Sequence, residues 1–324
     1  MKLDSKKIEI LEPKAQLKLY GYDNYFNTFL SLYKSGKLPK VILLDGQKGS
    51  GKATFVYHFI NYILSSDQDY SYSLKDFEIN LKNSSLKLME NNVHPNFFLL
   101  DSSKPEENIK IEQVRNLLRF LNKSVYPKNI KLVLIDNSEY LNINSANALL
   151  STLENANENT FFFIINNNTT KMLDTLLSRS IVYKIHFSIN NKKKIFKEIN
   201  YDYNLNINDS DLEKFLYFES PGNLLKFTSL FQEIESNITT SLLETILFLL
   251  DKFKYKKDLE YLYYISLYSE NYFNQLAIED SQNFYQYYLK KNKVIYLIDN
   301  MKKYNLDKKN LIISIERILK NEKK

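Results

Sequence analysis

The sequence predicts an α/β domain with a parallel sheet, followed by a small helical lid and an all-α C-terminal domain. Two observations carry this prediction. Apolar runs that do not alternate with polar residues recur between stretches of helical periodicity, which is typical of a parallel sheet buried on both faces. The 102 residues after Gly222 contain neither glycine nor proline, so they lack the residues that punctuate turns and are expected to be helical.

Each predicted element has a local reason. The strands are the apolar runs 41–45, 97–101, 131–136 and 161–165. The helices fill the intervals at 25–35, 53–65, 111–123 and 145–154, and two shorter ones follow at 190–200 and 209–218. Residues 66–92 are polar and irregular, so we expect a loose surface insertion there. Strand character fades after residue 180, and the predicted domains are 1–186, 187–238 and 239–324.

A glycine cluster is the first functional signal. Gly46, Gly49 and Gly51 are three of the six glycines in the chain, and they lie between a predicted strand and a predicted helix, directly before Lys52. This spacing matches the phosphate-binding loop G-x-x-x-x-G-K, in which backbone N–H groups and a helix N-terminus surround a phosphate and the lysine adds a charge. The alternative is a tight strand-to-helix turn that binds nothing.

The residue after the lysine departs from the motif. Ala53 stands where a serine or threonine hydroxyl normally binds Mg²⁺, and Thr54 lies one residue late, about 100° further round the helix. We therefore expect a loop suited to ATP or ADP, with Mg²⁺ when nucleotide is bound, but poorly equipped for hydrolysis. The residues expected to contact nucleotide are Gly46, Gly49, Ser50, Gly51, Lys52, Ala53, Thr54 and Asp136.

The second signal is the apolar strand that ends in Asp136. A carboxylate at this place commonly holds Mg²⁺ beside a phosphate loop. The next residue is Asn137, where hydrolytic ATPases of this architecture usually carry a glutamate that orients water, and an amide cannot act as a base. Glu139 would share a face with Asn137 in an extended strand. The alternative is an ordinary strand end with a capping aspartate.

Composition excludes several classes of protein. The chain of 324 residues has no cysteine and only three histidines, so we expect neither a disulfide scaffold nor a metal site. The first residues lack the apolar core of a signal peptide and no apolar run reaches membrane length, so we expect a cytoplasmic protein without a membrane partner. Arginine is rare among the 44 lysines and arginines, which suggests that its planar group is needed where it occurs, at Arg115, Arg119, Arg179 and Arg317.

Several sequence blocks match one family in order along the chain. They are 20–23, 35–38, 46–54, 94–96, 111–115, 134–142, 146–154, 160–165, 176–180 and 220–222. With these blocks the chain resembles the delta-prime family of the bacterial DNA polymerase III clamp loader, in the AAA+ superfamily. The helix block 146–154 and the Ser-Arg-Ser ending of 176–180 are the specific parts, and no likeness extends beyond 222.

The resemblance implies a function. Family members belong to a five-subunit ring with ATP-hydrolysing subunits and a delta subunit, and the ring places the sliding clamp on primed DNA. The delta-prime member acts as a stator that contributes little or no hydrolysis. The chain is therefore expected to be at most a part of a DNA-directed DNA polymerase holoenzyme, with intrinsic ATPase activity weak or absent and contact with the clamp only indirect.

The resemblance also implies site residues. Arg179 matches the arginine that family members present to the ATP of a neighbouring subunit, with Ser180 in place of a cysteine. The alternative is a salt bridge that closes the end of the α/β domain. Asn167 is implied as a sensor-like residue, and Gly222 and Asn223 stand where the lid usually carries a basic residue. Many relatives bind zinc through four cysteines, and the lack of cysteine here implies no zinc.

Two other functions compete with this interpretation. An active ATP-hydrolysing motor subunit of the same ring is disfavoured by Ala53, Asn137 and the missing basic residue of the lid. A stand-alone nucleotide kinase with a phosphate loop leaves the long helical tail without a role, and the base-reading motif of a GTPase is absent from the sequence. The net charge of +6, without a basic cluster, predicts weak and non-specific contact with primed DNA, and Arg115 and Arg119 are more often a solvated helix face than a DNA contact.

The C-terminal helices are predicted to join the ring. Apolar residues recur there at helical spacing, at Leu242, Leu243, Ile246, Leu247 and Leu250, and at Leu259, Leu262, Ile265 and Leu267. We expect these faces to pack against other subunits. A helical bundle that closes only on itself is equally consistent with the pattern.

Overall fold

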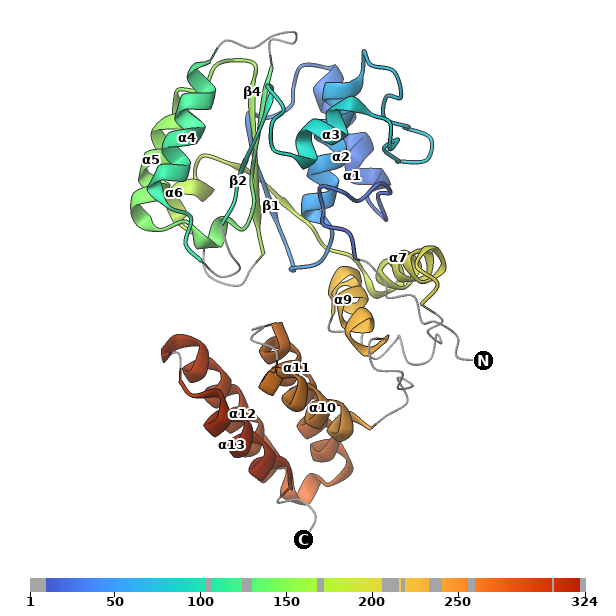
Figure 1. Cartoon of the computed structure of the whole chain (residues 1–324), viewed down its shortest axis with the longest axis vertical. Helices are drawn as coiled ribbons and strands as arrows, with labels where there is room; N and C mark the ends of the chain where they lie inside the picture. The colour runs from blue at the N-terminus through green and yellow to red at the C-terminus, as the bar shows by residue number, and fades with distance from the viewer. Residues whose placement is uncertain are drawn as a thin grey trace. The chain divides into compact units, whose positions relative to one another are not determined.

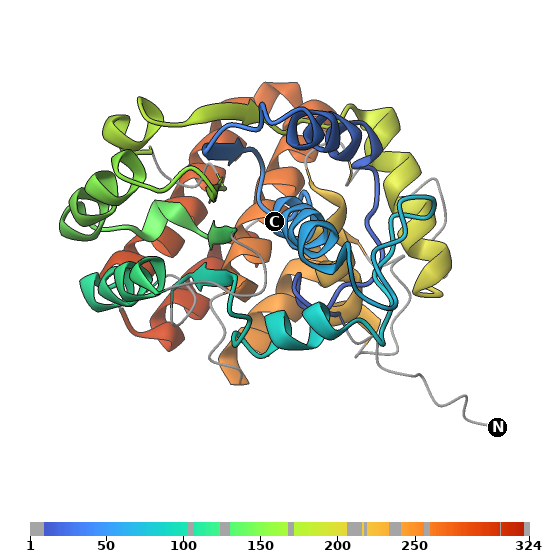
Figure 2. The same ribbon diagram turned by 90° about the horizontal axis from the view of Figure 1, so that it is seen from above.

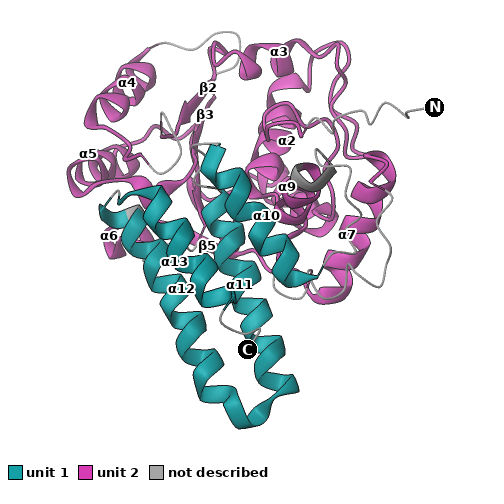
Figure 3. Ribbon diagram, turned by 60° about the horizontal axis from the view of Figure 1, so that its bottom comes forward, with its two compact units in different colours: residues 1–5, 230–324 teal, residues 6–229 magenta. Residues whose placement is uncertain are grey.

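The protein forms two compact units, within residues 6–229 and residues 230–324 (Figure 3). The computed structural model describes residues 10–102, 107–123, 130–167, 172–205, 216, 219–232, 241–255, 260–304 and 306–320. Apart from residue 216, the predicted helix 209–218 lies outside these ranges, as does Leu259. Among the helices within them, none combines the length and the hydropathy that a bilayer span requires. The first unit includes the predicted lid up to residue 229, while the exact domain boundaries stay predictions.

The first unit is built on a five-stranded parallel sheet with the order β2-β3-β4-β1-β5. Its strands are β1 (Val41–Asp45), β2 (Phe97–Leu100), β3 (Lys131–Ile135), β4 (Thr160–Asn166) and β5 (Ile181–Lys184). In the centre of the sheet Val41 of β1 lies beside Phe162 of β4, and every paired strand runs in the same direction. The predicted class, an α/β fold with a parallel sheet and a helical C-terminal region, is confirmed.

Helices cover both faces of this sheet (Figures 1 and 2). One face carries α1 (Asp23–Lys34), α2 (Lys52–Ser65) and α3 (Ser84–Glu90). The other carries α4 (Ile111–Asn122), α5 (Ile143–Glu154) and α6 (Asp174–Leu177). The lid contributes α7 (Ile189–Asp202) and α9 (Pro221–Gln232). Both faces of the strands are therefore buried, which explains why their sequences are continuously apolar.

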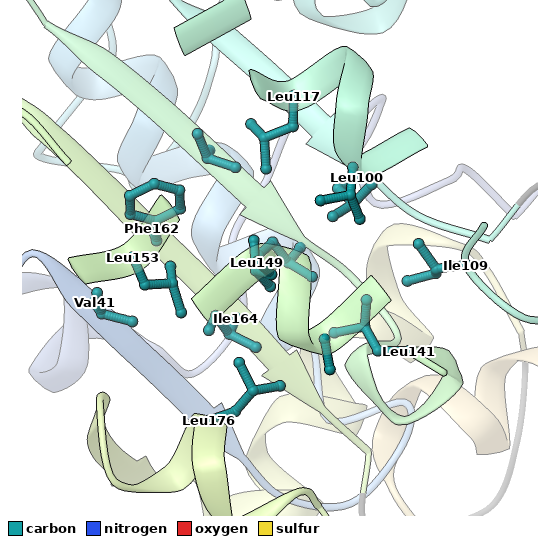
Figure 4. Packing of buried hydrophobic residues seen from close by; sticks show 14 of the residues in the cluster. Val41, Leu100, Ile109, Leu117, Leu141, Leu149, Leu153, Phe162, Ile164 and Leu176 are labelled. Carbon is teal, nitrogen blue, oxygen red and sulfur yellow. The ribbon is translucent and has the colours of Figure 1, made fainter. Parts of the chain in front are cut away.

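The face under α4, α5 and α6 is closed by a cluster of mainly aliphatic side chains (Figure 4). Leu100, Phe162 and Ile164 project from the strands, and Leu149 of α5 and Leu176 of α6 pack against them. All five are at most 1% exposed. Burial of one such side chain stabilises the fold by about 1.5–3 kcal/mol relative to its exposed state, so this cluster holds α5 and α6 in place.

The opposite face has an aromatic core that fixes α2, the helix that follows the phosphate loop. Phe26 and Phe29 of α1 meet Phe55 and Phe59 of α2 at ring-centroid distances from 5.1 to 6.3 Å in edge-to-face geometry. Aromatic pairs of this kind contribute about 0.5–1.5 kcal/mol each beyond the area they bury. These four fully buried rings therefore fix the position of the first turns of α2 against α1.

Two sequence predictions are corrected by the structure. Strand β5 was not predicted, because it has four residues at the edge of the sheet and its first two, Ile181 and Val182, are exposed. The predicted loose insertion at 66–92 is packed instead. It contains α3 and buries Tyr72 and Met89.

In the part of the second unit that the structure describes, four long helices form a bundle. They are α10 (Leu242–Tyr255), α11 (Glu260–Glu279), α12 (Phe284–Tyr304) and α13 (Lys308–Lys320). Ile246, Leu250, Leu262 and Ile265 are fully buried. These four residues therefore close the bundle on itself. Leu242, Leu243, Leu247 and Leu267 are only partly buried, and packing of their face against other subunits stays a prediction.

Candidate functional site

The glycine loop has the backbone conformation that its sequence demands. It follows the carboxyl end of β1, and α2 begins at Lys52. Gly49 and Gly51 have φ angles of 77° and 90°, a region that side chains with a Cβ rarely adopt. The predicted strand-loop-helix context is thereby present, with the first N–H groups of α2 directed to the loop.

Lys52 is bonded to the loop itself. Its Nζ donates to the carbonyl oxygens of Gly46 at 2.7 Å and Gln47 at 2.8 Å, and the residue is 3% exposed. Burial lowers the pKa of Lys52 to about 8, against the attraction of Asp136, Glu139 and Asp45. The amine is thus held inside the loop by the backbone, and a phosphate would have to draw it away from two carbonyl oxygens.

The loop fits a phosphate better than it fits a magnesium ion. Ala53 supplies no hydroxyl at the first position after the lysine, and Thr54 is partly buried on the next position of the helix. The Ser50 hydroxyl is buried and has no hydrogen-bond partner among the described residues. Mg²⁺ requires oxygen ligands, and Ala53 leaves it without the hydroxyl that the loop motif normally supplies, whereas the backbone of the loop still suits a phosphate.

A cavity of about 240 Å³ opens beside the loop. Gly46, Gln47, residues 184–187 and Lys192 contribute to its lining. Small-molecule sites typically measure about 300–1,000 Å³, so this cavity is smaller than a site for a whole nucleotide. Lys184 and Lys192 were not predicted from the sequence to line a site.

The carboxyl ends of β2, β3 and β4 bring a polar network next to the loop. Asn137 Nδ2 donates to Asp101 Oδ1 at 2.9 Å, and Asn167 Nδ2 donates to Asn137 Oδ1 at 3.0 Å. The backbone N–H of Asn167 also approaches Glu139 Oε2 at 3.4 Å. The sensor-like residue predicted from the sequence therefore joins the aspartate strand end, and Asp101 is a member that sequence reasoning missed.

Asn137 has a structural reason for being asparagine. Its φ angle is 51°, in the left-handed region that asparagine tolerates better than glutamate does. Its amide is committed to Asp101 and Asn167. The position that would orient an attacking water is thus used to tie three strand ends together.

Asp136 is a carboxylate whose pKa is raised. Burial, together with the charge of Asp101, raises the pKa of Asp136 to about 7, although the Asn137 N–H bonds it at 2.8 Å. In the unfolded chain this pKa is near 3.8. Between these two values the folded state binds more protons than the unfolded state, so the contribution of Asp136 to stability is lost as the pH rises through 7.

Asp136→Asn is expected to stabilise the protein at pH 8, because it removes a buried charge and keeps the side-chain shape. The gain in free energy of unfolding should be on the order of 1–3 kcal/mol at pH 8 and should shrink toward zero at pH 4. Thermal or urea unfolding at both pH values measures this, with the exposed Asp69→Asn as the control. An equal effect of Asp136→Asn at the two pH values would contradict the assignment.

Arg179 lies between α6 and β5 and is partly exposed. Its Nε and Nη2 both approach Glu154 Oε1 at 2.6 Å, and its Nη1 donates to the Thr175 carbonyl and to Ser178 Oγ at 3.2 Å. The Arg179 side chain is 36% exposed and the Glu154 side chain is 50% exposed. The salt bridge considered from the sequence is therefore present, and it is a solvated one of the kind worth about 0–1 kcal/mol.

The structure separates Arg179 from the other predicted site residues. Arg179 precedes β5, whereas the phosphate loop, Asp136 and Asn167 follow β1, β3 and β4. Because all strands are parallel, the loop residues gather at the carboxyl ends of the strands, and Arg179 lies at the amino end of β5, on the opposite side of the sheet. The loop, Asp136 and Asn167 form one site, and Arg179 does not reach it.

The family model described as DNA polymerase III, delta subunit matches residues 21–188, just over half of the chain. The chain belongs to this family. Its match covers the whole parallel sheet, the phosphate loop and Arg179. The sheet order, with the loop after the strand β1, agrees with the AAA+ class that the sequence predicts.

Two curated proteins illustrate the similarity of this chain to individual relatives. The DNA polymerase III subunit delta' of Pseudomonas aeruginosa is 28% identical over 139 residues, which are 43% of this chain and 40% of that protein. The DNA polymerase III subunit delta' of Bacillus subtilis is 26% identical over 182 residues, which are 55% of this chain and 49% of that protein. The chain thus spans less than half the length of these relatives.

Solved structures with a similar chain path include a DNA polymerase III gamma subunit-related protein of Thermotoga maritima. It is 14% identical, has a TM-score of 0.47, and the alignment covers 91% of this chain and 99% of that protein. Domain III of the Thermotoga maritima replication initiation protein DnaA is 16% identical, with a TM-score of 0.42 and coverage of 74% and 95%.

Proposed function

We propose that the chain is a clamp-loader subunit that does not turn over ATP itself and that completes the ATP site of a neighbouring subunit with Arg179. The family and the names of its relatives support a place among the subunits of a DNA polymerase III assembly. The ATPase subunits, a delta subunit, the clamp and primed DNA are the proposed partners.

The position of Arg179 is the observation that carries this proposal. Arg179 lies at the amino ends of the strands, whereas the phosphate loop of the same chain follows the carboxyl end of β1. An arginine so placed cannot serve its own loop, and we expect a ligand on another molecule to replace Glu154 as its partner, because that ion pair is solvated and weak. A guanidinium bonds phosphate oxygens in two places, which is how an arginine finger stabilises a transferring phosphoryl group.

The surface beside Arg179 supports a protein partner. Ile181 is 54% exposed and Val182 is 39% exposed at the start of the edge strand. Exposed apolar side chains next to an arginine are typical of protein interfaces, where arginine is enriched and lysine is depleted.

The phosphate loop supports the absence of turnover. Ala53 offers Mg²⁺ no hydroxyl, and the side-chain amide of Asn137 is hydrogen-bonded to Asp101 and Asn167. Phosphoryl transfer depends on a positioned metal and a positioned nucleophile, and both parts are missing or diverted here. Residual binding of ATP or ADP through the loop is compatible with this proposal.

Co-expression with the other clamp-loader subunits of the same organism tests the assembly. The chain should purify with them as one hetero-oligomer by size-exclusion chromatography, with or without added nucleotide. A chain that elutes alone as a monomer in their presence would contradict the proposal.

DNA binding by the isolated chain should be weak and salt-dependent. Arg115 and Arg119 are both paired with Glu112, at 3.2 and 3.3 Å, so their charges are already partly neutralised. We expect a dissociation constant of about 10⁻⁴–10⁻⁶ M, as for non-specific binding at physiological salt, unchanged within about twofold by replacing both arginines with alanine. Fluorescence anisotropy with a primed duplex measures this, and nanomolar affinity that resists salt would refute it.

A further inference from the structure

The segment 219–223, at the start of α9, is seated on the phosphate loop. The Ser220 hydroxyl donates to the Lys48 carbonyl oxygen at 2.8 Å. The Gly222 N–H donates to the Gly49 carbonyl oxygen at 3.0 Å. Both acceptors belong to the loop backbone, so the lid and the loop are joined by hydrogen bonds that no nucleotide mediates.

This contact requires glycine on both sides. A Cβ on Gly49 would lie 2.4 Å from Ser220 Oγ and 2.4 Å from Asn223 Oδ1. A Cβ on Gly222 would lie 2.5 Å from the Gly49 carbonyl oxygen. The φ angle of Gly222 is not in the left-handed region, so closeness to the loop, and not its own backbone conformation, demands a glycine there.

Hydrogen bonds among buried polar groups hold the segment 219–223 in place. Asn223 Nδ2 donates to Glu219 Oε2 at 3.0 Å, and Lys192 of α7 donates to the Glu219 carbonyl at 3.0 Å. Lys192 also reaches Gln47 Oε1 of the loop at 3.4 Å. Glu219, Ser220 and Asn223 are each less than 9% exposed. Because buried polar groups are costly when unpaired, opening the lid would expose or orphan this whole set.

We propose that Gly49 and Gly222, with Ser220, form a clasp that holds the lid closed on the phosphate loop without nucleotide. The loop glycines then serve a contact within the chain, and the lid position does not depend on ATP or ADP. A lid fixed in this way gives neighbouring subunits a constant surface whichever nucleotide is present. This inference concerns the resting conformation of the chain and does not require Arg179 to act in trans.

Gly222→Ala in the full chain tests the clasp, because two effects predict opposite signs. Within a helix, alanine is favoured over glycine by about two- to fivefold in the equilibrium constant, so helix propensity alone predicts slower opening of α9. Over-packing of a tight buried contact predicts the reverse, with opening favoured by about 5- to 150-fold. Amide hydrogen exchange of residues 219–229 and 46–52 measures this opening directly.

Two further variants keep the test decisive. Ser220→Ala removes one hydrogen bond and should accelerate exchange of the same amides by about 2- to 10-fold, even if Gly222→Ala fails to fold. Gly36→Ala is the control, because Gly36 has a φ of 68° with open space around it, so it carries backbone strain but no clasp contact. Its exchange increase should not be concentrated in the clasp amides.

The wild-type chain should show the same exchange at residues 219–229 with no nucleotide, with ADP and with ATP and Mg²⁺. Slower exchange in Gly222→Ala, unchanged exchange in Ser220→Ala, or several-fold protection of the lid by nucleotide in the wild type would each overturn the clasp. None of these outcomes depends on ATP turnover or on ring assembly, so they are distinct from a failure of the proposed function.

Discussion

A clamp-loader ring reconstituted with Arg179→Ala should assemble normally and lose ATP turnover at the one site that this arginine serves. A partner-supplied arginine is worth about 10³–10⁵ in rate in related phosphate-loop enzymes. Only one of several sites is affected, so total DNA-stimulated turnover should fall partially, and clamp loading by the complete ring should fall with it. Arg179→Lys should behave similarly, because a point charge cannot bridge two phosphate oxygens.

The Glu154 partner separates this role from a structural one. If Arg179 matters only through its ion pair, Glu154→Gln should impair the ring as much as Arg179→Ala. If Arg179 is a finger, Glu154→Gln should leave turnover and loading within a few-fold of normal, because the pair is solvated and worth little. Arg119→Ala, which removes another exposed arginine paired with a glutamate, is the matched control. A ring with Arg179→Ala that loads clamps at the unmutated rate would exclude the finger.

The second large effect is expected on assembly, from one face of α12. Tyr285, Tyr288, Leu289 and Tyr296 recur at helical spacing and are between 46% and 67% exposed. Tyrosine is enriched at protein interfaces, and truncation of a central anchor typically costs at least about 2 kcal/mol, or about 30-fold in affinity. The triple variant Tyr285→Ser, Leu289→Ser, Tyr296→Ser should therefore fail to purify with the ring.

The same variant should keep its helical circular dichroism, because these side chains do not line the core of the bundle. Tyr201→Ser, on an 82% exposed tyrosine of α7 in the other unit, is the control and should assemble normally. Normal assembly of the triple variant would move the interface to another surface of the chain.

The sequence predicted the sheet where strands are buried on both faces. Four strands were found because their apolar runs are continuous, and helices between them followed from their stripes. Strand β5 was not predicted because an edge strand of four residues with Ile181 exposed does not form a continuous buried apolar run. The insertion 66–92 was not recognised because its helix α3 has only seven residues, and two buried apolar side chains, Leu86 and Met89, are too few to establish a period.

For the site, the sequence identified what one continuous motif encodes. The loop Gly46–Lys52 and Asp136 were predicted from spacing and context, and Arg179 was predicted from the resemblance to the family. The contacts between distant segments were not found. Asp101 meets Asn137 across 36 positions, and Ser220 meets Lys48 across 172, so these pairings exist only once the sheet and the lid have folded. A second strand ending in aspartate, at Asp101, was the signal that was available.

Steady-state ATP hydrolysis tests the central claim most directly. It should be measured for the purified chain, for the other clamp-loader subunits without it, and for the two mixed, with primed DNA and clamp present. The account predicts no turnover by the chain alone and a higher rate in the mixture than in the other subunits by themselves. Turnover by the chain alone at the roughly 1–100 s⁻¹ of working phosphotransfer enzymes, abolished by Lys52→Ala, would contradict it.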